Sequence, residues 1–199
     1  MTIANQLTIC RIILVPPIVL CIVYARFVEA TILFLLAGIT DALDGLFARR
    51  RGETSRLGMM LDPLADKLLV GATFLALAVP SDALHVTIPA WLVILSIGRD
   101  AAILAGVSTF HLAFGPRSFP PSLLGKATTA IHLLVVLYVL AGNVAGFELV
   151  GSNALFGLAA ALVVMSAIHY AVVGQRVVAS VEDERSRTQD SRPEREDAP

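Results

Sequence analysis

Four aspartates occupy one stretch of the chain, and their spacing suits the binding of metal ions. Asp41 and Asp44 are three residues apart, and Asp62 and Asp66 are four apart. Each pair therefore shares one face of a helix if the stretch is helical. Carboxylates that converge in this way repel one another unless cations neutralise them. An all-oxygen ligand set favours a hard divalent ion, so the pattern predicts a site for Mg²⁺ or Mn²⁺.

The rest of the chain has the composition of a membrane protein. Of the 199 residues, 56% are hydrophobic and only 16% are charged, and the mean hydropathy is +0.78. Acidic groups at membrane depth are costly, rare and usually functional. The alternative is an interfacial salt-bridge cluster with nearby basic residues, namely Arg49, Arg50, Arg56 and Lys67. Four acids at these spacings, with glycines interleaved, favour the functional interpretation.

Apolar runs separated by short charged segments indicate the helices that must position the aspartates. A helix that crosses a bilayer needs roughly 20 mostly apolar residues. We extend the shorter runs through their flanking charges, which predicts an all-α polytopic membrane protein with six transmembrane helices. They are expected at roughly 9–25, 29–49, 62–80, 88–113, 123–146 and 152–175. Residues 1–181 would form one membrane domain.

The basic residues predict which side of the membrane each connection faces. Lys and Arg favour the cytoplasmic side in short loops. They gather in the second and fourth connections and after the last helix, at Arg49, Arg50, Arg51, Arg56, Arg117, Lys126 and Arg176. Among the opposite connections only Arg26 appears. Both termini and the aspartate cluster are therefore expected to face the cytoplasm.

The end of the chain, residues 182–199, differs sharply from the apolar region. It holds seven of the 16 acidic residues and four of the 15 basic ones, and it contains no large apolar side chain. Such a segment cannot offset its ordering entropy by burial, so we predict a disordered polar tail, with at most one exposed helical turn continuing the last span. The chain also lacks a polybasic block, which argues against a nucleic-acid partner.

The aspartates belong to a longer pattern, D-x-x-D-G-x-x-A-R-x8-G-x-x-x-D-x-x-x-D. This pattern resembles the signature of the CDP-alcohol phosphatidyltransferase family, including its cardiolipin synthases and phosphatidylglycerophosphate synthases. Eight residue types at fixed offsets make a specific signal. The matching positions are Asp41, Asp44, Gly45, Ala48, Arg49, Gly58, Asp62 and Asp66. The similarity extends through residues 5–11 and the six-helix plan, and so covers nearly everything before the tail.

This resemblance implies a phospholipid-synthesising enzyme that uses CDP-diacylglycerol, a membrane lipid, as donor and an alcohol as acceptor. Two metal ions, Mg²⁺ or Mn²⁺, would sit among the four aspartates and bind the pyrophosphate of the donor. Two metals can stabilise charge on both the attacking and the leaving oxygen. Asp41, Asp44 and Asp62 would be mainly ligands. Asp66 would be a ligand and also the catalytic base, with CMP as leaving group. The resemblance also implies a homodimer.

The same motif implies a nucleotide-binding surface formed by Gly45, Ala48, Arg49 and Gly58. Gly45 and Ala48 lack bulk beside the carboxylates, as a cytidine against the helix would require. Close helix packing by small residues explains these two nearly as well. Arg49 is suited to holding a phosphate, although an anchor at the cytoplasmic helix end would look the same.

The acceptor must be decided by the second half of the chain. In relatives that use glycerol 3-phosphate, the fifth helix opens with Gly-Lys-x-Lys-Thr, whereas residues 125–129 read Gly-Lys-Ala-Thr-Thr and lack the second lysine. The segments at 98–100, 116–118 and 166–170 resemble the cardiolipin-forming group. We therefore favour phosphatidylglycerol as acceptor and cardiolipin as product. Glycerol 3-phosphate is the close alternative, and inositol phosphate a distant one.

Four residues are expected to contact the acceptor: Arg99, Arg117, Lys126 and Thr129. The three basic residues would meet its phosphate, although cytoplasmic-side anchoring explains them equally well. His132 lies on the same helical face as Lys126 and Thr129.

Two other classes of membrane protein use comparable residues. A metal transporter would place its acids near the bilayer midplane on discontinuous helices, whereas these acids are predicted at cytoplasmic helix ends. An aspartate-rich prenyltransferase normally needs two separated acidic boxes, and this chain has one. The sequence therefore favours the phosphatidyltransferase hypothesis over both.

Overall fold

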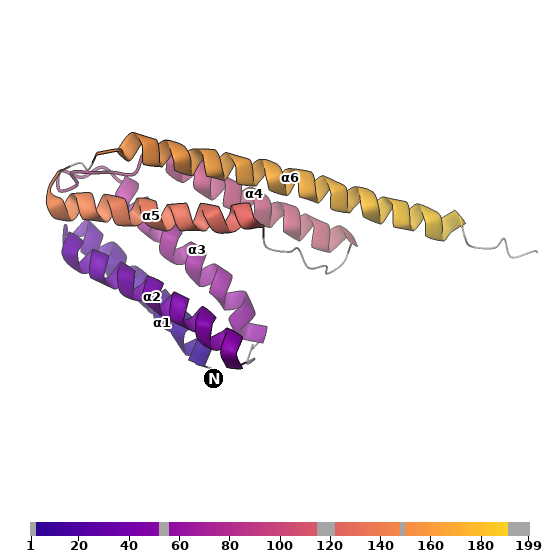
Figure 1. Cartoon of the computed structure of the whole chain (residues 1–199), viewed down its shortest axis with the longest axis horizontal. Coiled ribbons are helices and arrows are strands. Elements are labelled where there is room, and N and C mark those ends of the chain that lie inside the picture. The colour runs from indigo at the N-terminus through magenta and orange to yellow at the C-terminus, as the bar shows by residue number, and fades with distance from the viewer. Residues whose placement is uncertain (1–2, 52–55, 115–121, 148–149, 191–199) are drawn as a thin grey trace, which may run out of the picture.

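The protein is a bundle of six helices, with no strand in the part of the chain that the structure describes (Figure 1). The computed structural model describes the backbone of residues 3–51, 56–114, 122–147 and 150–190, and most side chains in residues 8–40, 65–112, 122–147 and 150–175. The helices are α1 Ile3–Val23, α2 Phe27–Arg51, α3 Arg56–Ala78, α4 Ala90–Phe114, α5 Leu123–Ala145 and α6 Ser152–Asp190. Within these ranges, the predicted all-α class and the order of six helices are confirmed.

Helix α5 lies at the centre of the bundle. It contacts α2 and α3 on one side and α6 on the other, while α1 packs on α2 and α3, and α4 packs on α6 and α3. Because α5 is covered by these helices, a broad stripe of its side chains is buried. Val135, Val136, Val139 and Leu140 are fully buried. This central helix brings the first three helices and the last three into one core.

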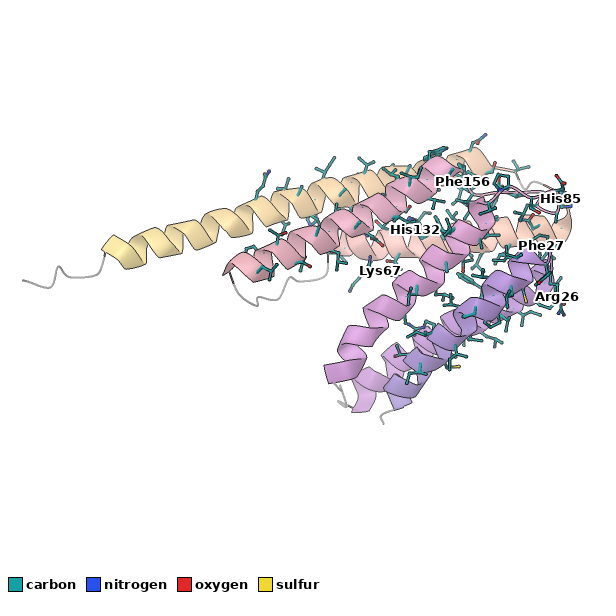
Figure 2. All side chains as sticks on the ribbon, turned by 180° about the vertical axis from the view of Figure 1, so that it is seen from behind. Arg26, Phe27, Lys67, His85, His132 and Phe156 are labelled. Atoms are coloured by element: carbon teal, nitrogen blue, oxygen red, sulfur yellow. The ribbon has the colours of Figure 1, made fainter. Side chains whose placement is uncertain are left out.

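One end of the bundle is held together by the link between α3 and α4. The side-chain oxygen of Asn143 on α5 accepts hydrogen bonds from the backbone N–H of His85 at 2.7 Å and of Val86 at 3.2 Å, and its amide nitrogen donates to the Val86 carbonyl at 2.8 Å. A Cβ on Gly142 would lie 2.8 Å from a methyl group of Val86, so only glycine permits this approach. His85 lies at the same end as the Arg26–Phe27 turn (Figure 2). These contacts fix the relative positions of α3, α4 and α5.

The outer surface of the bundle is largely apolar. Three helical segments are long and apolar enough to cross a membrane, namely Ala90–Phe110, Leu123–Ala145 and Ser152–Gln175, and Thr8–Val23 and Phe27–Thr40 are shorter apolar segments. Large side chains on α4, such as Ile94 and Leu112, point outward and are more than two thirds exposed. Extended apolar surface of this kind is what a bilayer covers. The structure therefore has the surface of an integral membrane protein.

Helix α6 differs from the expected disorder of the tail. It continues past the apolar segment to Asp190, so residues 182–190 are helical, and residues 191–199 lie outside the described part (Figure 1). Five of the nine residues 182–190 are Glu, Arg or Gln, which are good helix formers. Acidic residues 182–184 precede Arg185 and Arg187, an order that favours helix at spacings of three and four. The preceding span also removes the cost of nucleation.

Candidate active site

The predicted metal ligands lie on two helices joined by a short link. Asp41 and Asp44 are on α2, and Asp62 and Asp66 are on α3. Only residues 52–55 separate the two helices, so their adjacent ends are at most about 18 Å apart.

The four aspartates are distributed evenly about this link. Asp44 lies about 10 Å along its helix before the link and Asp62 about 9 Å after it, at 1.5 Å per residue. The corresponding rise is about 15 Å for Asp41 and for Asp66. This backbone placement fits a shared site. The structure describes only the backbone of residues 41–51 and 56–64. The convergence of Asp41, Asp44 and Asp62 on one site therefore stays a prediction. The same holds for the nucleotide-binding roles of Gly45, Ala48, Arg49 and Gly58.

Asp66 is the one aspartate of the motif whose side chain is described. It forms an ion pair with the Nη1 atom of Arg11 on α1. The Arg11 side chain is fully buried, whereas that of Asp66 is 41% exposed. The guanidinium therefore anchors the carboxylate from behind, and the carboxylate remains accessible from the other side.

Asp66 opens onto a cavity of about 430 Å³ between α3, α4 and α5. Its polar lining residues are Asp66, Lys67, Ser96, Arg99, Asp100, Thr129 and His132. Its apolar wall consists of Val70, Gly71, Phe74, Ile97, Ala101 and Leu104. A mainly apolar cavity with a few convergent polar groups is typical of a ligand site.

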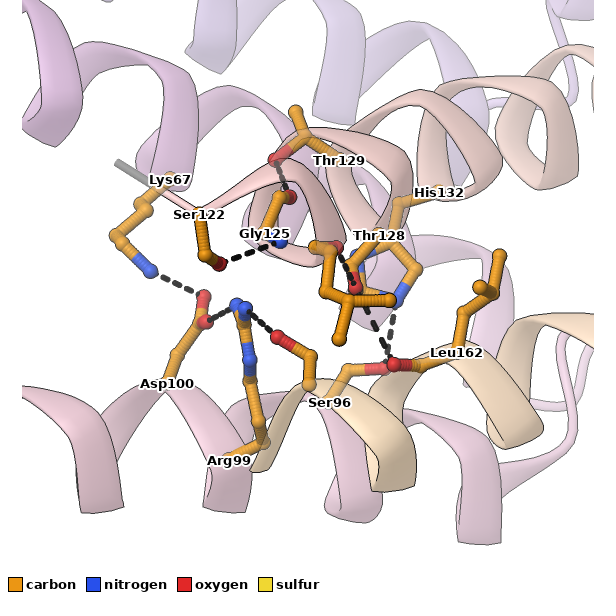
Figure 3. Close-up of polar contacts among 12 residues, drawn as sticks. Lys67, Ser96, Arg99, Asp100, Ser122, Gly125, Thr128, Thr129, His132 and Leu162 are labelled. Carbon is orange, nitrogen blue, oxygen red and sulfur yellow. Dashed lines mark hydrogen bonds and ion pairs between the residues drawn. The ribbon is translucent and has the colours of Figure 1, made fainter. Parts of the chain in front are cut away.

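Three charged residues in the cavity form a continuous network (Figure 3). Lys67 Nζ lies 2.5 Å from Asp100 Oδ2, and Arg99 Nη1 lies 2.6 Å from Asp100 Oδ1. The second nitrogen of Arg99, Nη2, donates to Ser166 Oγ on α6 at 2.5 Å. The guanidinium also lies 5.7 Å from the ring centre of Tyr170, within the range of a cation–π contact. Arg99 is thus fixed by two helices before any ligand binds.

The start of α5 approaches this network closely. Ser122 caps the helix, and its hydroxyl accepts a hydrogen bond from the Gly125 N–H at 3.0 Å. A Cβ on Gly125 would lie 3.2 Å from the Tyr170 hydroxyl and 3.7 Å from Arg99 Nη2. The missing side chain at Gly125 therefore leaves room for Tyr170 and Arg99.

A second polar pair lies one turn further toward the α3–α4 link. Ser96 Oγ and His132 Nε2 are 3.0 Å apart. The His132 ring packs edge-on against Phe74, with 5.0 Å between ring centres. Lys67 on α3 reaches Asp100, whereas His132 on α5 reaches Ser96, about one turn earlier on α4. Both side chains are labelled in Figure 2. The cavity thus has a charged part near Asp66 and a neutral, hydrogen-bonding part beyond it.

The structure brings together some of the residues expected to contact the acceptor, and their binding roles remain predictions. Arg99 and Thr129 line the cavity with Asp66. Lys126 is exposed and is not among the lining residues. Arg117 lies outside the described residues. Thr128, at the position of the missing lysine, is buried, and its hydroxyl donates to the Leu124 carbonyl at 2.7 Å. This position faces α6 and not the cavity.

Sequence reasoning missed several residues at this site, above all Arg11, Lys67 and Asp100. A signal was present for Arg11, because it is a lone charge at the start of a long apolar run. In the sequence, Asp100 stands out only as part of the 98–100 resemblance, and Lys67 only as a possible partner of the aspartates. Neither was expected to pair with the other.

The four aspartates of the motif form a donor set whose chemistry suits a divalent metal. Among the described residues, no group of three or more His, Cys, Asp and Glu side chains could hold a metal ion. Three of the four predicted ligands fall outside that set. The fourth, Asp66, offers an exposed carboxylate at the edge of the cavity. Four carboxylates on α2 and α3 would supply the all-oxygen ligands that Mg²⁺ and Mn²⁺ prefer.

Comparison with known proteins identifies the family of the chain. A profile of CDP-alcohol phosphatidyltransferases matches residues 1–173. A probable cardiolipin synthase (CMP-forming) of Drosophila melanogaster is 35% identical over 68% of this chain, which spans 46% of that relative. The CDP-diacylglycerol--glycerol-3-phosphate 3-phosphatidyltransferase of Aquifex aeolicus is 30% identical over 89% of this chain and 98% of its own length. The protein of the same name from Rickettsia bellii is 36% identical over 83% of this chain and 91% of its own length.

These matches leave the metal-transporter and prenyltransferase hypotheses without support. The match covers both helices that carry the aspartates and all three helices that line the cavity. On its sequence pattern, its fold and these relatives, the chain is a member of the CDP-alcohol phosphatidyltransferase family.

Proposed function

We propose that this protein transfers the phosphatidyl group of CDP-diacylglycerol to a glycerol-type alcohol and releases CMP. The observation that carries the proposal is the cavity that the accessible carboxylate of Asp66 lines together with the cations Lys67 and Arg99. The acceptor hydroxyl attacks the β-phosphorus of the donor, and the bond from that phosphorus to the bridging oxygen breaks. The proton of the hydroxyl goes to Asp66, and the electron pair of the broken bond leaves with CMP.

Each group of residues has a separate task in this reaction. Asp41, Asp44, Asp62 and Asp66 would hold two Mg²⁺ or Mn²⁺ ions, which neutralise the pyrophosphate when bound. Gly45, Ala48, Arg49 and Gly58 would accommodate the cytidine nucleotide. Arg99 and Lys67 would hold the acceptor's phosphate, and the cavity that they line together with Thr129 supports this role. Arg117 and Lys126 would add positive charge for acceptor binding, as the family resemblance implies.

Phosphatidylglycerol is the acceptor that we favour, with cardiolipin as product. Arg99 and Asp100 support it by their resemblance to the cardiolipin-forming group, and so does the absence of the second lysine. Glycerol 3-phosphate is the second candidate, because the two relatives that this chain covers almost completely carry that substrate in their names.

The acceptor is tested with purified protein, CDP-diacylglycerol and one acceptor at a time. We expect metal-dependent CMP release with phosphatidylglycerol and formation of cardiolipin, with less product from glycerol 3-phosphate and least from inositol phosphate. Product with glycerol 3-phosphate and none with phosphatidylglycerol would reject the cardiolipin assignment and keep the reaction class. No CMP release with any acceptor would reject the reaction itself.

We also propose that all six helices cross the membrane, that both termini and the α2–α3 link face the cytoplasm, and that the protein is a homodimer. The basic residues around the aspartate motif support this orientation. The resemblance to the family supports the dimer.

Cysteine labelling tests the orientation. In a variant with Cys10 and Cys21 changed to serine, Thr87→Cys places one thiol at an exposed position of the α3–α4 link. A membrane-impermeant reagent should label it from outside intact cells. Val86→Cys is the matched control, because Val86 is buried and should react poorly. Labelling from outside at Ser55→Cys, with none at Thr87→Cys, would invert the topology.

A further inference from the structure

We propose that Asp100 sets the charge of the acceptor site, so that the site selects a phosphate group with one negative charge over one with two. This inference rests on the proposed phosphatidyl transfer and deepens it by naming the chemical class of the acceptor. A phosphodiester such as that of phosphatidylglycerol carries one negative charge. A phosphomonoester such as glycerol 3-phosphate carries close to two at neutral pH.

The geometry of the cluster places Asp100 between two cations. Its two carboxylate oxygens are divided between them, Oδ2 to Lys67 on α3 and Oδ1 to Arg99 on α4. The Lys67 and Asp100 side chains are 52% and 35% exposed, so both border the open space of the cavity. Arg99 is only 9% exposed and is held from behind by Ser166. An anion in the cavity would therefore meet Lys67 and Arg99, whose positive charge Asp100 already neutralises in part.

The network of Lys67, Arg99 and Asp100 carries a small positive charge. Lys67 and Arg99 contribute two positive charges and Asp100 one negative, which leaves +1. Asp66 contributes one negative charge, which Arg11 balances from behind. The remaining polar lining residues, Ser96, Thr129 and His132, are taken as neutral. A monoanionic acceptor is therefore matched by this cluster, whereas a dianionic one keeps an excess negative charge.

Among the described residues, the acceptor would meet positive charge mainly from Lys67 and Arg99, because Thr128, at the position of the missing lysine, does not face the cavity. The Thr128 side chain is buried against α6 and does not line the cavity. Lys126 is exposed and is also absent from the lining. Within the part of the chain that the structure describes, selection by charge therefore acts chiefly through Lys67, Arg99 and Asp100.

A charge series tests the proposal. Asp100→Asn changes the net charge of the cluster from +1 to +2, Lys67→Gln changes it to 0, and the double variant returns it to +1. The quantity to measure is kcat/KM for glycerol 3-phosphate divided by kcat/KM for phosphatidylglycerol in the same detergent. One unit charge within a few ångströms of a phosphate, partly screened by water, should change this ratio by roughly tenfold. The ratio should rise in Asp100→Asn, fall in Lys67→Gln and return near the wild-type value in the double variant.

Two further variants separate charge from shape. Asp100→Glu keeps the charge and should leave the ratio within about threefold of the wild type. Thr129→Lys adds a cation to the cavity wall without altering Asp100 and should raise the ratio, whereas Thr129→Gln, of similar length, should not. These variants also provide the test if Asp100→Asn fails to fold.

The outcomes that overturn the proposal are distinct from failure of the proposed reaction. If the wild type and the variants release CMP but the ratio stays constant across the series, Asp100 does not select by charge. The same conclusion follows if Asp100→Glu changes the ratio as much as Asp100→Asn. A wild-type protein that releases no CMP with either acceptor would instead refute the phosphatidyl transfer on which the inference rests.

Discussion

The Asp62→Asn protein is expected to release CMP from CDP-diacylglycerol about a thousandfold more slowly than the wild type, while its expression stays normal. Asp62 begins the second pair of the motif, on α3, where its carboxylate is proposed to hold the metal ions. A metal contributes several kcal/mol of charge stabilisation in the transition state, and each 1.4 kcal/mol corresponds to a factor of ten in rate. Asparagine keeps the size of the side chain and removes its charge. Asp41→Asn and Asp44→Asn should behave in the same way.

A binding measurement separates metal loss from other causes. Ligands that bind only the folded protein raise its melting temperature. Mn²⁺ should therefore raise the melting temperature of the purified wild type and have a much smaller effect on Asp62→Asn. The matched control is Asp82→Asn, which removes an acid from an exposed position of the α3–α4 link. That variant should keep both its activity and its response to Mn²⁺. Near-normal turnover of Asp62→Asn at ordinary Mg²⁺ would contradict the metal assignment.

The helices could be predicted from the sequence because their main signal is local. Apolar runs of sufficient length indicate each span without knowledge of its neighbours. The ends were less predictable. Helix α3 begins at Arg56, six residues before the expected start at 62, and α2 includes Arg50 and Arg51 beyond its expected end. Arginine is a good helix former, so a hydropathy boundary understates the length of the helix.

The site was predictable only where its residues lie close together in the sequence. The aspartate motif falls within one stretch and has a fixed spacing. The contacts around the cavity join distant residues: Arg11 to Asp66 across 55 positions, and Arg99 to Ser166 across 67. Such pairs depend on how α1 meets α3 and how α4 meets α6. No periodicity in a single helix encodes these arrangements.

The Asp66→Asn protein is expected to lose roughly 10²- to 10⁴-fold in the rate of transfer, the usual contribution of a general base. Its binding of CDP-diacylglycerol should be largely retained, because Asp41, Asp44 and Asp62 remain to hold the metals. The Asp66 carboxylate is accessible from the cavity that Arg99 and Thr129 also line, so an acceptor hydroxyl can reach it. An amide in its place has no basic oxygen to take the proton.

The measurement must separate chemistry from binding and from folding. Equilibrium binding of CDP-diacylglycerol and single-turnover release of CMP should be compared in the same preparation. Asp66→Asn also leaves the fully buried Arg11 without its negative partner. Removing one partner of a fully buried ion pair lowers the free energy of unfolding by about 3–5 kcal/mol. Because Asp66 is partly exposed, the loss in this variant should be smaller.

A double variant resolves the remaining ambiguity. Arg11→Gln combined with Asp66→Asn removes both charges of the pair, so its melting temperature should recover relative to Asp66→Asn alone. Its transfer rate should stay low, because the base is still missing. Recovery of transfer in the double variant would show that the single variant failed through instability. Loss of donor binding in Asp66→Asn, with single-turnover chemistry intact, would make Asp66 a binding residue and leave the identity of the base open.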